Sequence, residues 1–240
     1  MSTADTGPIW TRPEPAGRKP RFTRDQIAAA ALRVADTDGF DAVTMKRIAA
    51  ELGSGTMTLY YYVRNKADVV ALMQDAILAD LLVPDAELRA GWRAATATIA
   101  RRTRTVLIAH PWAALSLTDA AFGPNAMRHM EQNLTTLAAT ELGITEKFAL
   151  IAAVDAYVLG TALQAIELAS RADSTTESVA AAIQFGEALL ETGEFPELDA
   201  AYREQRDATA PPMTDPALRE QFEQGLAALL DGFAARLSLS

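Results

Sequence analysis

Apolar residues recur at helical spacing along most of the chain. The first such face is formed by Ile27, Ala30, Ala31 and Val34, which lie at i, i+3, i+4 and i+7 and therefore on one side of a helix. No run of alternating apolar and polar residues, which would indicate a half-buried strand, interrupts this pattern. We therefore expect an all-α protein, and the sequence shows no internal repeat.

The first helices are marked by their end residues. Thr23 and Gln26 have the spacing of a capping box, in which each side chain bonds the main chain of the other. Thr44 and Asn65 can cap later helices by accepting bonds from free amides, and the helices that begin at Thr23, Thr44 and Asn65 end at a helix-breaking glycine or proline. The predicted starts are Thr23, Thr44, Thr56 and Asn65, and the predicted ends are Gly39, Gly53, Tyr62 and Pro84.

The rest of the chain is also expected to be helical, over residues 86–109, 112–120, 124–141, 145–170, 175–192 and 216–237. Residues 148–169 are long and apolar enough to cross a membrane. However, Asp155, Gln164 and Glu167 lie inside this segment, and polar groups are costly in lipid. A helix buried in a protein bundle is the better interpretation, and we expect no membrane contact.

Charge is distributed unevenly along the chain. Residues 1–66 hold 10 Lys and Arg against 7 Asp and Glu, whereas the remainder holds 12 against 24. This asymmetry indicates a nucleic-acid-facing head on an acidic body, although soluble helices also carry uneven charge. Residues 1–21 contain four prolines and four basic residues, so we expect a flexible basic arm. The predicted DNA-binding domain then covers 22–68, and a regulatory domain covers 69–240.

Several function classes lack their motifs. With no cysteine, the chain has no disulfide, thiolate metal site or thiol nucleophile. The N-terminus lacks the apolar run of a signal peptide, and we expect a cytoplasmic protein. No glycine-rich phosphate loop, G-x-S-x-G or His-Glu helix motif occurs, so we assign no catalytic residue. The two histidines have no carboxylate cluster nearby, and we expect no metal and no cofactor.

Two short helices joined by a glycine-containing turn, about Thr44–Leu52 and Thr56–Tyr62, form a helix-turn-helix. Three consecutive tyrosines cannot all face one interior from a helix, although aromatic residues at helical spacing are usually core. Leu59 and Val63 would face the core, and the tyrosines would partly face outward. Outward positions are Thr56, Met57, Tyr60 and Tyr61, flanking positions are Thr58 and Tyr62, and the surrounding cations are Lys46, Arg47, Arg64 and Lys66.

These residues carry a family resemblance. The stretch "FTRDQIAAAALRVADTDGFDAVTMKRIAAELGSGTMTLYYYVRNKADVVALM" resembles the N-terminal DNA-binding domain of TetR-family transcriptional regulators, over roughly residues 22–75. The pieces "AHPW" (109–112), "GPNAMRHMEQNL" (123–134) and "FEQGLAALLDGF" (222–233) are similar to the C-terminal domain of the tetracycline-repressor-like branch.

The resemblance implies a homodimer that binds a double-stranded DNA operator. It also implies a C-terminal domain that binds a small molecule, changes the separation of the two heads and releases DNA. By position, Lys46, Thr56, Met57, Tyr60 and Tyr61 would read bases, and Thr58, Tyr62 and Lys66 would hold phosphates. Family members often have Gln-Pro where Thr56 and Met57 stand, so an operator sequence cannot be borrowed.

The regulatory domain offers apolar residues and a few polar anchors for a ligand of unknown identity. The candidates are Trp92, His110, Trp112, Phe122, Met127, Met130, Tyr157 and Gln164, of which the aromatic ones are also plausible core. His129 is a further possible anchor. Helices 145–170 and 216–237 would form the dimer. We predict a ligand-responsive repressor; the alternatives are an activator of the same fold and a small-molecule-binding helical protein without regulatory DNA binding.

Overall fold

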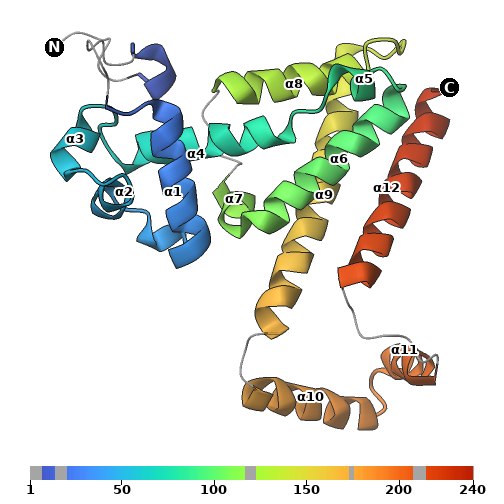
Figure 1. Ribbon diagram of the computed structural model, residues 1–240. Coiled ribbons are helices and arrows are strands. Elements are labelled where there is room, and N and C mark those ends of the chain that lie inside the picture. The colour runs from blue at the N-terminus through green and yellow to red at the C-terminus, as the bar shows by residue number, and fades with distance from the viewer. Residues whose placement is uncertain (1–6, 14–20, 117–122, 173–175, 208–214, 240) are drawn as a thin grey trace. The chain divides into compact units, whose positions relative to one another are not determined.

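The computed structural model describes residues 7–13, 21–116, 123–172, 176–207 and 215–239. Within these residues every regular element is a helix and no strand occurs, so the all-α prediction is confirmed (Figure 1). The elements are η2 (Ile9–Thr11), α1 (Arg24–Asp38), η3 (Phe40–Ala42), α2 (Met45–Glu51), α3 (Thr56–Tyr60), α4 (Lys66–Leu81), α5 (Asp85–Leu88), α6 (Trp92–Ala109), α7 (Pro111–Ser116), α8 (Pro124–Thr136), α9 (Ile144–Ala172), α10 (Thr176–Glu191), α11 (Pro196–Asp207) and α12 (Asp215–Leu237).

The chain forms two compact units. The first comprises Met1–Leu163 and Leu229–Ser240, and the second comprises Gln164–Ala228. In the first unit α1 packs on α2 and α4, and α4 continues along α6 and α8. The predicted head therefore shares one unit with the helices that follow it. In the second unit α10 packs against α11.

The core of the head follows the predicted apolar face. Ile27, Val34, Ile48 and Leu59 are all fully buried in one cluster. The capping box at the start of α1 is confirmed, because Gln26 N donates to Thr23 Oγ1 at 3.1 Å and Thr23 N donates to Gln26 Oε1 at 3.0 Å. Thr44 and Asn65 cap α2 and α4 as predicted. The start points of these helices were therefore readable from local sequence.

The described part of the N-terminal arm differs from the expected flexible chain. Residues 9–11 form a helical turn, and Ile9 is only 1% exposed in the head core. Arg12 forms an ion pair with Asp68 of α4, and Arg24 Nη2 donates to the Arg12 carbonyl at 2.9 Å. An apolar side chain and a buried ion pair thus hold this segment in place. Residues 1–6 and 14–20 lie outside the described part.

Several predicted helix bounds are wrong. The helix expected over 86–109 is two helices, because the chain turns at Gly91, whose φ of +96° favours glycine. The helix expected over 124–141 ends at Thr136, and the one expected to reach Tyr62 ends at Tyr60. The helix expected over 112–120 is described only over Pro111–Ser116, and residues 117–120 lie outside the described part.

The polar helix α11 was missed altogether. It begins with Pro196 as its first residue and carries Glu197 and Asp199 in its first turn, where acidic side chains stabilise a helix. Arg203 Nε donates to Asp199 Oδ1 at 3.0 Å, one turn away. Acidic residues in the first turn and local ion pairing therefore support this helix without a continuous apolar stripe.

One helix in the described part of the chain, Ile144–Ser170, is long and apolar enough to span a membrane by length and composition alone. Only 28% of its most apolar window is buried within the chain. On its inner side Leu150, Val154 and Val158 are buried, whereas Phe148 is exposed. An apolar face of α9 therefore remains uncovered within one chain.

Candidate nucleic-acid interface and ligand site

The glycine turn between α2 and α3 has the geometry of a helix-turn-helix. Leu52 is the C-cap of α2, and Gly53 has a φ of +60°, a conformation that side chains rarely adopt. Ser54 N then donates to the Ala49 carbonyl at 2.8 Å, which closes the turn before Thr56 begins α3. The turn fixes α3 across α2 and leaves one side of α3 toward solvent.

The exposed side of α3 and its C-cap is aromatic and apolar. Met57 is 81% exposed, Tyr61 is 64% exposed and Tyr60 is 46% exposed. On the opposite side Leu59 and Val63 are fully buried. Side chains of this size are usually covered, so a group of three on a five-residue helix and its cap is a candidate interaction surface.

Other predicted contact residues border this surface. Thr56 and Thr58 are half-buried on α3, and Lys46 is exposed on α2. Lys66 is exposed at the start of α4, where its Nζ lies 5.0 Å from the centre of the Phe40 ring. The surface thus combines hydroxyls, apolar side chains and cations, the groups that contact base edges and phosphates.

Tyr62 does not lie on the exposed surface, in contrast to the prediction. It is 8% exposed, and its hydroxyl accepts from Arg21 N at 2.9 Å and from Phe22 N at 3.2 Å. The reason is that α3 ends at Tyr60, so helical spacing no longer sets the direction of Tyr62. Tyr62 ties the entry of α1 to the end of α3, and its phosphate contact stays a prediction.

Arg47 also differs from its predicted role. Its Nε donates to Asp38 Oδ2 at 2.9 Å and its Nη1 donates to Glu51 Oε2 at 3.1 Å. These bonds raise the pKa of Arg47, and bonds from Arg33 and then Arg47 lower the pKa of Glu51. A phosphate would have to compete with two carboxylates for this guanidinium, so Arg47 joins α1 to α2.

The structure adds Arg21 to the surface. Its Nη2 donates to the Gly53 carbonyl at 3.0 Å, which places an exposed cation beside the turn that precedes α3. From sequence alone Arg21 belongs to the arm, because nothing local connects it with a turn 32 residues later. Its position next to Phe22, the first apolar residue before α1, was the available signal.

Two ligand candidates, His110 and Trp112, lie instead between the body and the head. His110 Nδ1 is 2.8 Å from Asp36 Oδ1 of α1, and Trp112 Nε1 donates to the same oxygen at 3.3 Å. The Trp112 ring stacks on Phe40, with 5.3 Å between ring centres. These contacts connect α6 and α7 with the head.

The other ligand candidates lie on several different helices. Met127 and Met130 are exposed on α8, and Gln164 is exposed on α9. Trp92 and Tyr157 are half-buried on different helices. Phe122 lies outside the described part.

Buried polar residues form a more coherent candidate site between α6 and α8. The hydroxyls of Thr96 and Thr136 are 3.3 Å apart, and Asn133 Nδ2 is 3.2 Å from His129 Nε2. Burial lowers the pKa of His129 to about 4, so the imidazole is neutral at neutral pH. Arg104 is also buried, on α6. The sequence analysis named His129, but it missed the others because threonine and asparagine have no distinctive spacing.

Asp75 connects α4 with the start of α8. Its Oδ1 accepts from Asn125 N at 2.9 Å and from Ala126 N at 3.2 Å, and its Oδ2 accepts from Asn125 Nδ2 at 3.0 Å. A carboxylate here caps the free amides of a helix N-terminus. Burial nevertheless raises the pKa of Asp75 above its usual value, against the opposing effect of these bonds.

Two family models match the chain. Residues 27–73 match the family described as bacterial regulatory proteins, tetR family, and residues 84–237 match the tetracyclin repressor-like C-terminal domain. Between them, the matched segments contain both helices of the helix-turn-helix and the helices that carry the buried polar residues.

Individual relatives extend the similarity. The chain is 33% identical over 221 residues to the HTH-type transcriptional repressor DrrR1 of Streptomyces coeruleorubidus, covering 90% of this chain and 78% of the relative. It is 37% identical over 157 residues to an HTH-type transcriptional regulator of Saccharopolyspora erythraea, covering 65% and 66%.

The fold is similar to that of ActR from Streptomyces coelicolor. The apo form has a TM-score of 0.69 at 25% identity, covering 91% of this chain and 97% of ActR. ActR in complex with actinorhodin has a TM-score of 0.68 at 25% identity, covering 90% and 98%. The helix-turn-helix, the helical body and the matched domains together show that this chain belongs to the TetR family of bacterial transcriptional regulators.

Proposed function

We propose that this chain is a cytoplasmic repressor that binds a near-palindromic operator as a homodimer and is released by a small-molecule inducer. DrrR1, the relative at 33% identity, is named a transcriptional repressor. ActR has been crystallised with actinorhodin and with (S)-DNPA. Repression would follow from occupation of the operator, and the proposal involves no catalytic step.

The observation that carries this proposal is the exposed face of Met57, Tyr60 and Tyr61 on the second helix of the helix-turn-helix. In this motif the second helix enters the major groove. We assign these three side chains, together with Thr56 and Lys46, to base contacts. Thr58 and Lys66 would hold phosphates, and Arg21 would add a third backbone contact. We leave Tyr62 and Arg47 out of this assignment, because Tyr62 is buried and Arg47 is bonded to two carboxylates within the head.

The uncovered face of α9 supports a homodimer. Along this face Phe148 is 45% exposed, and Ala152, Ala156 and Gly160 are also exposed. Small side chains at these positions permit close approach of a second helix. The predicted apolar stripe of α12 is different, because Phe222, Leu226 and Leu230 are already buried within one chain. Dimer contacts from α12 would come from its other side, where Ala227 and Gly232 are exposed.

The buried polar residues between α6 and α8 support an effector site in the body. Thr96, Arg104 and Asn133 would orient a mostly apolar ligand, as the few polar groups of a ligand site do. Binding would be coupled to operator affinity by a free energy of typically ~1–3 kcal/mol, which acts in both directions.

The test compares Tyr60→Ala and Tyr202→Ala with the unmodified protein on an operator recovered by selection. Tyr60 lies on α3, whereas Tyr202 is an exposed tyrosine on α11 in the other unit. We expect Tyr60→Ala to weaken specific binding while sedimentation still shows a dimer, and Tyr202→Ala to bind normally. Unchanged operator affinity in Tyr60→Ala would show that α3 is not the reading helix.

A further inference from the structure

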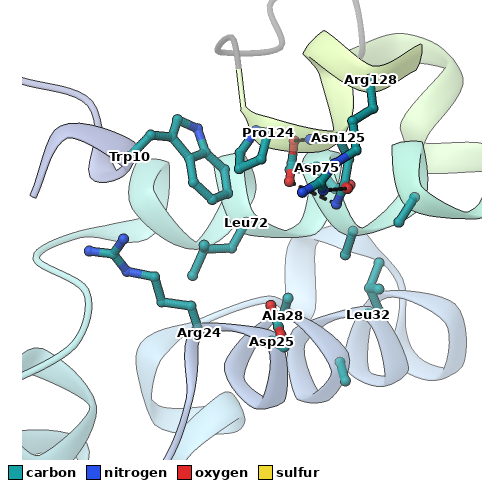
Figure 2. Close-up of a pocket in the computed structure, with 13 residues that line it drawn as sticks. Trp10, Arg24, Asp25, Ala28, Leu32, Leu72, Asp75, Pro124, Asn125 and Arg128 are labelled. Atoms are coloured by element: carbon teal, nitrogen blue, oxygen red, sulfur yellow. Dashed lines mark hydrogen bonds between the residues drawn. The ribbon is translucent and has the colours of Figure 1, made fainter. Parts of the chain in front are cut away.

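A cavity of about 610 Å³ lies where the head meets the body, apart from the buried polar residues of the body. Its walls come from four elements of the first unit: the N-terminal segment, α1, α4 and the start of α8 (Figure 2). This volume is within the range of about 300–1,000 Å³ typical of small-molecule sites. Its lining includes Trp10, Arg24, Ala28, Leu72, Ala76 and Arg128.

The inner wall of the cavity is apolar. Ala28 and Leu72 are buried, and Ala76 is half-buried beside them. Figure 2 shows the Trp10 ring next to Pro124, with Leu72 between Trp10 and Arg24. A planar apolar molecule fits such a wall, because small side chains leave a smooth surface and an indole ring offers stacking.

Among the polar groups that line the cavity, hydrogen-bond donors outnumber the acceptors that are not already bonded. Trp10 Nε1 and Arg24 Nε are buried atoms that find no acceptor among the described residues. Both carboxylate oxygens of Asp75 already accept bonds from Asn125 and Ala126. Arg128 adds an exposed cation, of which one nitrogen donates to Asn125 Oδ1. Asp25 at the rim is the remaining acid of the lining. Buried donors without acceptors favour a ligand that brings oxygen atoms.

The packing around Gly123 connects this cavity to the chain before α8. A Cβ at Gly123 would lie 2.2 Å from Asp75 Oδ1 and 2.9 Å from Trp10 Cζ2. The backbone therefore passes directly against both the α8 cap and the indole. A molecule that moves Trp10 would also act on this contact, and so on the relation between the head and α8.

We propose that this cavity is a second effector site, which takes a flat aromatic carboxylate with its ring against Trp10 and Leu72 and its carboxylate toward Arg128. Binding at this site does not depend on the proposed repressor function, although its effect on the operator rests on that function. The ligand would contact the head and α8 together. It would therefore stabilise one arrangement of the head relative to α8 and so change operator affinity.

The first experiment locates binding by fluorine NMR. The chain has three tryptophans, Trp10, Trp92 and Trp112, and labelling with fluorotryptophan gives each a separate signal. Trp10→Phe identifies the signal of Trp10. Titration of the full-length dimer with naphthoate should shift the Trp10 signal in a saturable way. A shift confined to Trp92 or Trp112, or no shift up to about 1 mM naphthoate, a concentration that detects even weak sites, would overturn the proposal.

The second experiment tests the cavity and its cations by calorimetry with naphthoate. Ala76→Phe fills the cavity and should abolish binding, while Ala94→Phe, an exposed position on α6 outside the cavity, should bind normally. Arg128→Gln should weaken binding about tenfold, the usual result of removing a charged hydrogen-bond partner. Arg89→Gln, an exposed arginine elsewhere, should have no effect. Normal binding in a folded Ala76→Phe protein would contradict the site.

The third measurement separates this site from the proposed function. Operator affinity is measured with and without saturating naphthoate in the unmodified protein and in Ala76→Phe. A change in the unmodified protein alone supports regulation through the cavity. If the Trp10 signal shifts but operator affinity is unchanged, the regulatory part of the proposal is wrong and the binding site stands. Absence of any operator binding would count against the proposed function, while the NMR result still decides the site.

Discussion

Asp75→Ala tests the connection between α4 and α8. The carboxylate is 5% exposed and accepts two main-chain amides, Asn125 N at 2.9 Å and Ala126 N at 3.2 Å. Alanine leaves both amides without their acceptor, and a buried donor without a partner costs about 1–3 kcal/mol. Burial raises the pKa of Asp75, so burying this charge costs free energy. Removing the carboxylate recovers part of that free energy and offsets part of the lost hydrogen bonding. We therefore expect a net loss of about 2–4 kcal/mol in the free energy of unfolding.

The assay is urea unfolding followed by circular dichroism at fixed protein concentration, because a dimer's stability depends on concentration. Asp80→Ala is the matched control, since Asp80 is an exposed carboxylate on the same helix. Asp75→Ala should unfold at a lower urea concentration than Asp80→Ala, and the dependence of its unfolding free energy on urea should be unchanged. If the unfolding free energies of Asp75→Ala and Asp80→Ala differed by less than about 0.5 kcal/mol, the usual range for surface changes, the cap that Asp75 forms on α8 would not stabilise the protein.

Three further predictions use other contacts. Tyr62→Phe removes the hydroxyl that accepts Arg21 N and Phe22 N and should cost about 1–3 kcal/mol, whereas Tyr61→Phe should be neutral; equal thermal midpoints would refute the role of Tyr62. Burial lowers the pKa of His129 to about 4, below its value of about 6.5 in the unfolded chain. Keeping the imidazole neutral therefore adds up to about 3 kcal/mol to the free energy of unfolding above the unfolded pKa, and this stability is lost as the pH falls toward the folded pKa. Urea unfolding of His129→Gln should accordingly vary less with pH over that window; an unaltered pH dependence would contradict this. Lys66→Ala should weaken binding to all DNA sequences and lower the salt slope by about 1, and a loss restricted to the operator would show that Lys66 reads bases.

Local features made the head readable from sequence. The capping box of Thr23 and Gln26 and the N-caps Thr44 and Asn65 act within three residues, so the sequence contains both partners of each bond. The outward direction of Met57, Tyr60 and Tyr61 followed from the buried positions of Leu59 and Val63 and from a short helix that cannot enclose three tyrosines.

Long-range contacts were not readable in this way. The ion pair of Arg12 with Asp68 and the bonds of Tyr62 to residues 21 and 22 join positions about forty to sixty residues apart. Arg47 looked like a DNA contact because one of its two acidic partners, Asp38, lies on another helix, although the other, Glu51, is four residues along the same helix. The same reasoning explains His110, whose partner Asp36 belongs to the head. Ionic partners that lie on separate elements are set by packing, and packing leaves no local pattern.

The measurement that tests the central claim most directly is selection of bound duplexes from a random DNA pool by the purified dimer, followed by sequencing. We expect enrichment of one inverted repeat whose half-sites are spaced by about one helical turn or a multiple of it. The same selection with Met57→Ala should lose or change the preference inside the half-sites while the spacing is kept. No enrichment by a folded dimer, or the same enriched sequence from Met57→Ala, Tyr60→Ala and Tyr61→Ala, would contradict the assignment of α3 as the helix that reads DNA.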